Sequence, residues 1–177
     1  MYKYGHIGLA FIFAAPVAIL FNILHGPYWG IALMGLSFVT CKVPDIDNRT
    51  SLLVHRGFAH TIWFGIIVST ILSLVLTIIL SVGMENIKTG IQVTDLLLQN
   101  WTIAVIVFTG LFIGFLSHLF GDIITEAYDY TINPYWPVTN KSYKLGWTKS
   151  GAKTWNYGFL VGGVVSILIV IGTAVMF

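Results

Sequence analysis

Five long runs of apolar residues set what this chain can fold into. The runs are 7–24, 28–41, 58–82, 101–120 and 157–177. Most of them reach the roughly 20 residues that a helix needs to cross a ~30 Å hydrocarbon core. Only 9% of the 177 residues are charged, far below the usual share in a soluble domain. We therefore predict an all-α polytopic membrane protein with about five transmembrane helices, forming one integral-membrane domain over residues 1–177.

Two of these runs have specific features at their ends. The second is short, and we expect it to span with little tilt or by letting Lys42 snorkel. No small-residue cleavage site follows the first, which ends in His25-Gly26-Pro27, so we expect a retained helix rather than a signal peptide. Cys41 is the single cysteine, which excludes a disulfide framework and a thiolate zinc site. The net charge of +2 does not indicate nucleic-acid binding.

The basic residues predict the orientation in the membrane. If the N-terminus is cytoplasmic, five spans leave only Lys88 on the outer side. The cytoplasmic side then receives Lys3, Lys42, Arg49, Arg56, Lys141, Lys144, Lys149 and Lys153. This distribution follows the positive-inside rule. We expect an integral cell-membrane protein with a cytoplasmic N-terminus and an external C-terminus.

The fourth run ends in ionisable residues with helical spacing. Gly110, Gly114, His118 and Asp122 recur every four residues, so they form a stripe on one helical face. The glycines would let another helix approach closely. The imidazole and carboxylate are placed to grip one cation, although the same spacing also suits an aspartate that only hydrogen-bonds the histidine. Such residues at membrane depth are costly and are read as functional. We also expect Glu126 to extend this ladder as a supporting acid in catalysis.

A second motif, Pro44-Asp45-Ile46-Asp47, follows the second run. The proline biases Val43 away from helix, which predicts an ordered bend that carries two carboxylates. Both carboxylates are candidates for metal ligands. Alternatively, one binds the metal while the other orients a histidine or takes a proton from water. A third possibility is that both aspartates are only solvated residues that form the turn. We favour Asp45 as the better ligand and count Asp47 among the catalytic candidates as well.

A third motif, His55-Arg56-Gly57-Phe58-Ala59-His60, opens the third run. His55 and His60 are about 140° apart on an ideal helix, so one regular helix would not aim both at one ion. We expect Gly57 to permit a tight turn and the helix to begin near Phe58. Arg56 is either a phosphate-binding side chain or a topology anchor. His6, near the start of the first run, is either an interfacial residue or a further ligand.

This ordered set of motifs resembles the YdjM-like family of membrane-bound proteins, described as metal-dependent hydrolases. That family in turn is similar in motif order to zinc-dependent phospholipase C and single-strand nuclease enzymes, which are all-helical phosphodiesterases. The resemblance implies that one metal is bound by Asp45, His60, His118 and Asp122, and that His6 serves a neighbouring metal. This sequence lacks the later histidines and the His-x-x-x-Glu element of those soluble enzymes, which points to one or two metals rather than three.

Residues and resemblance together predict a metal site at the cytoplasmic membrane face. Its metal candidates are His6, Asp45, Asp47, His55, His60, His118 and Asp122, with Asp47, Arg56 and Glu126 as catalytic candidates. Imidazole and carboxylate ligands without thiolate suit zinc, with manganese as the second choice. We expect a hydrolase that cleaves a phosphoester of a lipid or lipid-linked substrate and has membrane lipids as its partners. The alternative is a non-catalytic metal-binding membrane protein, with a structural metal or a transport role.

Overall fold

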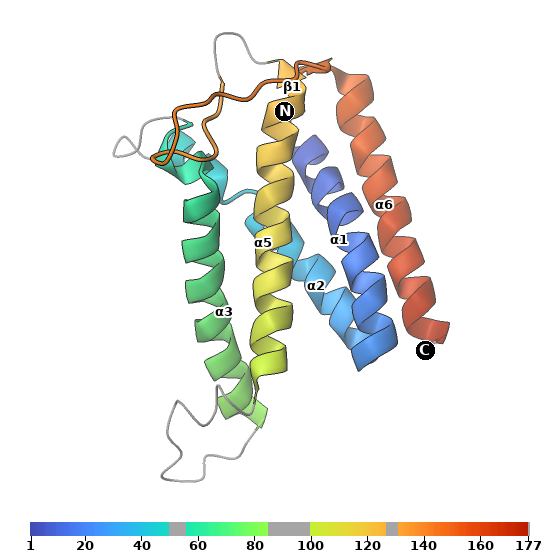
Figure 1. Ribbon diagram of the computed structural model, residues 1–177. Coiled ribbons are helices and arrows are strands. Elements are labelled where there is room, and N and C mark those ends of the chain that lie inside the picture. Colours follow the sequence, from blue (N-terminus) through green and yellow to red (C-terminus); the bar gives the residue numbers. More distant parts are fainter. Residues whose placement is uncertain (50–55, 85–99, 127–130, 177) are drawn as a thin grey trace.

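A computed structural model describes residues 1–49, 56–84, 100–126 and 131–176 (Figure 1). Within these ranges, five helices are long and apolar enough to cross a membrane, the second when the turn after it is included. The helices are α1 (Lys3–His25), α2 (Pro27–Thr40), α3 (Ile62–Met84), α5 (Trp101–Ile124) and α6 (Lys153–Met176). The prediction of an all-α protein with five spans is confirmed, including the short second span.

Helix α5 holds the bundle together, because α1, α2 and α3 all pack against it. Helix α6 lies on the outside of the bundle, against α1 and α2. The N-terminus and the C-terminus lie at opposite ends of the bundle (Figure 1), as expected for an odd number of crossings. His25 ends α1 and lies far from His6, which is in the first turns of the same helix.

The glycine stripe of α5 brings α2 into close contact, as the spacing predicted. A Cβ atom added to Gly110 would lie 2.9 Å from Leu36 Cβ, and one added to Gly114 would collide with Ser37 and Thr40. The Thr40 hydroxyl donates to the carbonyl oxygen of Leu111 at 2.6 Å. Because α2 lies so near, the chain that follows it reaches the last turns of α5.

Two short 3-10 helices connect α2 to α3. The first, η1, covers Pro44–Arg49, and the second, η2, covers Phe58–His60. We expected the third helix to begin near Phe58, but it begins at Ile62. Thr61 is extended, with φ −104° and ψ 149°, and its hydroxyl accepts from the N–H of Phe64 at 3.2 Å, as an N-cap residue does. His60 therefore lies in a tight turn before the helix and not within its first turn.

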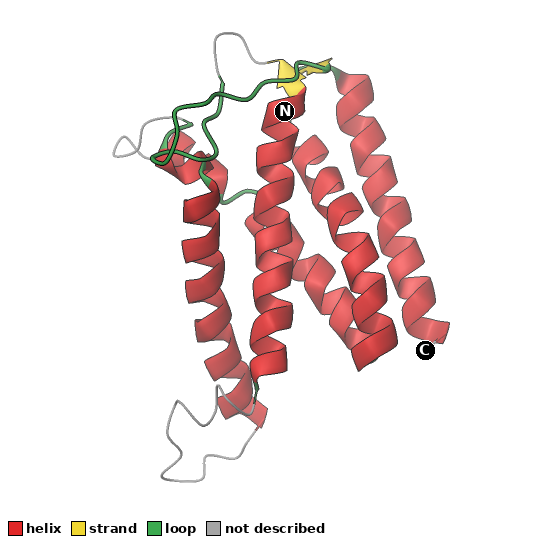
Figure 2. Ribbon diagram, in the orientation of Figure 1, coloured by secondary structure: helices red, strands yellow, loops and turns green. Residues whose placement is uncertain are grey.

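The connection from α5 to α6 lies across the end of the bundle that carries the N-terminus (Figure 2). Strand β1 (Thr125–Glu126) pairs in parallel with β2 (Thr148–Lys149). The expectation that Glu126 extends the four-residue ladder was wrong, because α5 ends at Ile124 and Thr125 is extended, with φ −94° and ψ 130°. The connection is also tied to the start of α3, where the N–H of Ile62 donates to Pro134 at 2.8 Å.

Candidate metal centre

Side chains from four elements meet at the N-terminal end of the bundle. They are His6 from α1, Asp45 from η1, His60 from η2, and His118 and Asp122 from α5. They form two overlapping groups that share His118, and within each group one ligand atom per residue lies within 4.8 Å of the others. The structure thus brings together five of the seven predicted ligands. The predicted ligand His55 lies outside the described residues.

The spacing of these atoms suits a metal better than direct hydrogen bonds. His118 Nε2 lies 3.5 Å from Asp122 Oδ2 and 3.7 Å from Asp45 Oδ1, and His60 Nε2 lies 3.4 Å from Asp122 Oδ2. Hydrogen bonds between such groups span about 2.7–3.2 Å. A tetrahedral zinc ion with ligands at about 2.0–2.2 Å separates them by about 3.3–3.6 Å. His118 Nε2 is also buried and forms no hydrogen bond with the described residues. The residues therefore fit a bound cation.

Outer contacts orient both histidine rings toward this space. His118 Nδ1 lies 2.7 Å from the carbonyl oxygen of Cys41. Because a carbonyl only accepts, Nδ1 carries the proton and Nε2 presents its lone pair inward. His60 Nδ1 lies 3.1 Å from Asp47 Oδ2, so a carboxylate lies beside the ring nitrogen that faces away from Asp122. A second partner of this kind is typical of metal-ligating histidines.

Asp47 therefore differs from Asp45 in its position. Its Oδ2 atom contacts His60 and also accepts from the backbone N–H of Arg56 at 2.6 Å. It belongs to neither ligand group, and it is only 4% exposed. Of the two alternatives for the Pro44 motif, this geometry matches one ligand, Asp45, and one carboxylate that orients a histidine.

The tight turn before His60 is formed by both Arg56 and Gly57. Arg56 has φ 58°, in the left-handed region, and Gly57, at φ −83° and ψ −132°, is neither helical nor extended, as expected of a glycine in a tight turn. A left-handed conformation costs a residue with a side chain about 1–2 kcal/mol. The hydrogen bond from the Arg56 N–H to the buried carboxylate of Asp47 compensates for this strain. It also keeps the Arg56 side chain beside the cluster, with Nη2 3.9 Å from Asp122 Oδ1.

His6 joins the cluster through the other oxygen of Asp122. Its ring stacks on His118 with centroids 4.0 Å apart and an 11° interplanar angle, and its Nε2 lies 3.5 Å from Asp122 Oδ1. The Met1 amino nitrogen lies 3.7 Å from the same oxygen, and its burial lowers its pKa against the opposing effect of Asp122. The Arg56 guanidinium also lies on the Oδ1 side, so a first metal is favoured on the Oδ2 side.

The centre is exposed on one side. The side chains of His6, His60, His118 and Asp122 are at most 4% exposed, whereas that of Asp45 is 42% exposed. Glu126 is exposed on β1, and no contact between it and the cluster is recorded among the described residues. The centre is therefore reached from the side of Asp45.

Sequence reasoning missed two parts of this arrangement. The carbonyl that orients His118 comes from Cys41, and a backbone carbonyl leaves no signal in residue type. Gly121 makes room for His6, since a Cβ atom there would lie 2.8 Å from His6 Nδ1. A glycine beside Asp122 is a signal that could have been noticed.

Comparison with known proteins assigns the chain to a membrane protein family. No curated protein and no solved structure matches the chain. The model of a family described as YdjM inner membrane protein matches residues 1–177. With its five apolar helices and its full-length match, the chain is an integral membrane protein that belongs to the YdjM inner membrane protein family.

Proposed function

We propose that this protein is a metal-dependent hydrolase that cleaves a phosphoester of a lipid or lipid-linked molecule at the membrane surface. The observation that carries the proposal is the cluster of buried histidines and Asp122 that is open at the exposed Asp45. A structural metal is normally closed off by four protein ligands, whereas a catalytic metal keeps one position open. The exposure of Asp45 therefore favours catalysis over a structural role.

The proposed metal is zinc, held by Asp45, His60, His118 and Asp122. When bound, zinc supplies a water of lowered pKa and a Lewis acid for a phosphoryl oxygen. Asp45 would be the exposed ligand of this set, and its carboxylate would take the proton of a water that replaces it on the metal. Asp47 keeps the His60 ring in position through Nδ1. It is a positioning residue in this scheme rather than the base.

Arg56 is the proposed phosphate-binding residue. Its guanidinium lies beside Asp122, at the edge of the cluster, and is 11% exposed. Guanidinium groups pair with phosphoryl oxygens in a two-bond geometry. Arg56 would neutralise the charge of the phosphoester and align it with the centre.

A lipid substrate fits the placement of the site. His118 and Asp122 are in the last turns of a spanning helix, and Asp45 directly follows another span. A lipid headgroup reaches this level while its chains stay in the hydrocarbon. Lys149 and Lys153 lie at the same end, and each basic residue near an anionic surface contributes about 1 kcal/mol of attraction. We propose that this end faces the cytoplasm, because the distribution of basic residues favours that orientation.

The test combines metal content with an activity assay. Purified protein is analysed for zinc and manganese and is then assayed against phospholipids and lipid phosphates with either metal supplied. We expect His118→Ala and Asp122→Ala to lose both metal and hydrolysis. The matched control is His25→Ala, which removes a histidine at the opposite end of α1 and should keep both. Full turnover in a His60→Ala, His118→Ala protein would refute the catalytic centre. Bound metal without hydrolysis of any lipid phosphoester would support the structural alternative.

A further inference from the structure

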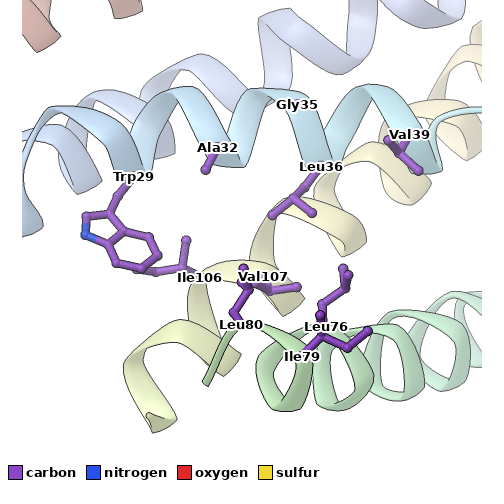
Figure 3. Close-up of a pocket in the computed structure, with 10 residues that line it drawn as sticks. All are labelled: Trp29, Ala32, Gly35, Leu36, Val39, Leu76, Ile79, Leu80, Ile106 and Val107. Atoms are coloured by element: carbon purple, nitrogen blue, oxygen red, sulfur yellow. The ribbon is translucent and has the colours of Figure 1, made fainter. Parts of the chain in front are cut away.

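A groove of about 320 Å³ lies on the membrane-facing side of the bundle, between α2 and α3 (Figure 3). Both helices pack against α5 but diverge from each other, so α5 forms the floor of the groove. Helix α2 contributes Ala32, Gly35 and Val39, and α3 contributes Leu76 and Leu80. Ile106 and Val107 of α5 lie between these two walls (Figure 3).

The groove exists because α2 has small residues at positions where larger side chains would fill the space between α2 and α3. A Cβ atom added to Gly35 meets no atom within 4 Å. Gly110 and Gly114, in contrast, are needed for contact between helices. Gly35 therefore leaves open space and makes no close approach to another helix. Its neighbours in the groove are apolar, and all of them lie within spans that face hydrocarbon.

The groove extends from the metal-centre side of α2 to at least the depth of one leaflet. Val107 and His118 are on the same helix, and 11 residues at 1.5 Å each place them about 17 Å apart along its axis. One leaflet contributes about half of a ~30 Å hydrocarbon core. Val39, at the other wall, precedes Cys41, whose carbonyl orients His118, by only two residues. A lipid with its phosphate at the metal centre would thus have a chain end at the depth of the groove.

We propose that this groove binds one hydrocarbon chain of a lipid from the leaflet on the side of the metal centre, with the phosphate headgroup at that centre. The inference rests on the proposed function and names its substrate class. The substrate is a phospholipid with long chains, and a short-chain or water-soluble phosphoester lacks the part that the groove holds.

The test fills the groove without disturbing the packing of the bundle. Gly35→Trp places an indole in the open space, and Gly35→Ala adds only one methyl group. Gly172→Trp is the matched control, because Gly172 on α6 also has no atom within 4 Å of an added Cβ. Each protein is reconstituted with dioleoyl phosphatidylglycerol and washed in detergent, and the lipid that stays bound is counted by native mass spectrometry.

We expect the wild type, Gly35→Ala and Gly172→Trp to retain one lipid per chain, and Gly35→Trp to lose it. Retention of this lipid by Gly35→Trp at the wild-type level would overturn the inference. Gel filtration and zinc content show whether each variant is folded. Ala32→Phe, which narrows the same groove from the next turn of α2, replaces Gly35→Trp if that variant does not fold.

A kinetic readout separates this inference from the proposed function. If the protein hydrolyses phospholipids, Gly35→Trp should raise KM for a dioleoyl substrate and leave KM for a dihexanoyl substrate unchanged. An equal change for both chain lengths would contradict the groove while leaving the hydrolase intact. Loss of the retained lipid in Gly35→Trp, together with no hydrolysis by the wild type, would refute the proposed function and support the groove.

Discussion

Asp47→Ala tests whether a buried carboxylate outside the ligand groups controls metal binding. The carboxylate lies 3.1 Å from His60 Nδ1 and accepts from the backbone N–H of Arg56 at 2.6 Å. Alanine removes both contacts. The His60 ring then loses the group that directs its Nε2 atom toward Asp122, and the turn at Arg56 loses the bond that compensates for its left-handed conformation.

The expected effect on metal affinity is intermediate. Loss of an outer partner of a metal-ligating histidine typically weakens metal affinity by about 10- to 100-fold. This corresponds to about 1.4–2.7 kcal/mol of binding free energy. Asp47→Asn keeps an oxygen in place and loses only the charge, so its effect should be smaller, at most about tenfold. His118→Ala removes a ligand atom and should weaken binding more than either.

The assay is a zinc competition titration of detergent-purified protein against a chromophoric chelator at constant pH. Glu126→Ala serves as the matched control, because that acid is exposed on β1, and it should bind zinc like the wild type. Wild-type affinity in Asp47→Ala would refute the orienting role. An effect as large as that of His118→Ala would show that Asp47 is itself a ligand.

Two further predictions concern the support of the site and its side of the membrane. Gly121→Ala should lower zinc content, because its Cβ atom would lie 2.8 Å from His6 Nδ1 and displace that ring, which stacks on the ligand His118. Unchanged zinc by elemental analysis would show that His6 does not support the centre. A cysteine placed at Lys144 should be protected from an impermeant thiol reagent in intact cells. A cysteine at Tyr28, which is 82% exposed at the opposite end of the bundle, should react. The reverse labelling pattern would show that the topology is inverted.

Hydrophobic patterning predicted the spans well, because the hydrocarbon core requires long apolar helices. The apolar run predicted the start of α5 at Trp101, whereas its continuation through Asp122 was indicated only by the four-residue ladder. The apolar run stops at Phe120, whereas the helix continues to Ile124. Asp122 remains helical there because His6, His60 and His118 surround its carboxylate. Hydropathy alone does not report such partners.

Helical periodicity in the sequence was sufficient to place His118 and Asp122 on one face and to identify Gly110 and Gly114 as the packing face for α2. The order of motifs also indicated which residues would gather. Tertiary structure alone decided the separate roles of Asp45 and Asp47, since the two differ only in which side chains lie near them. It also decided that Arg56 takes the left-handed turn and that the Cys41 carbonyl orients His118. Those features depend on the distances between elements and on backbone groups. Because backbone groups are the same in every residue type, the sequence carries no signal for them.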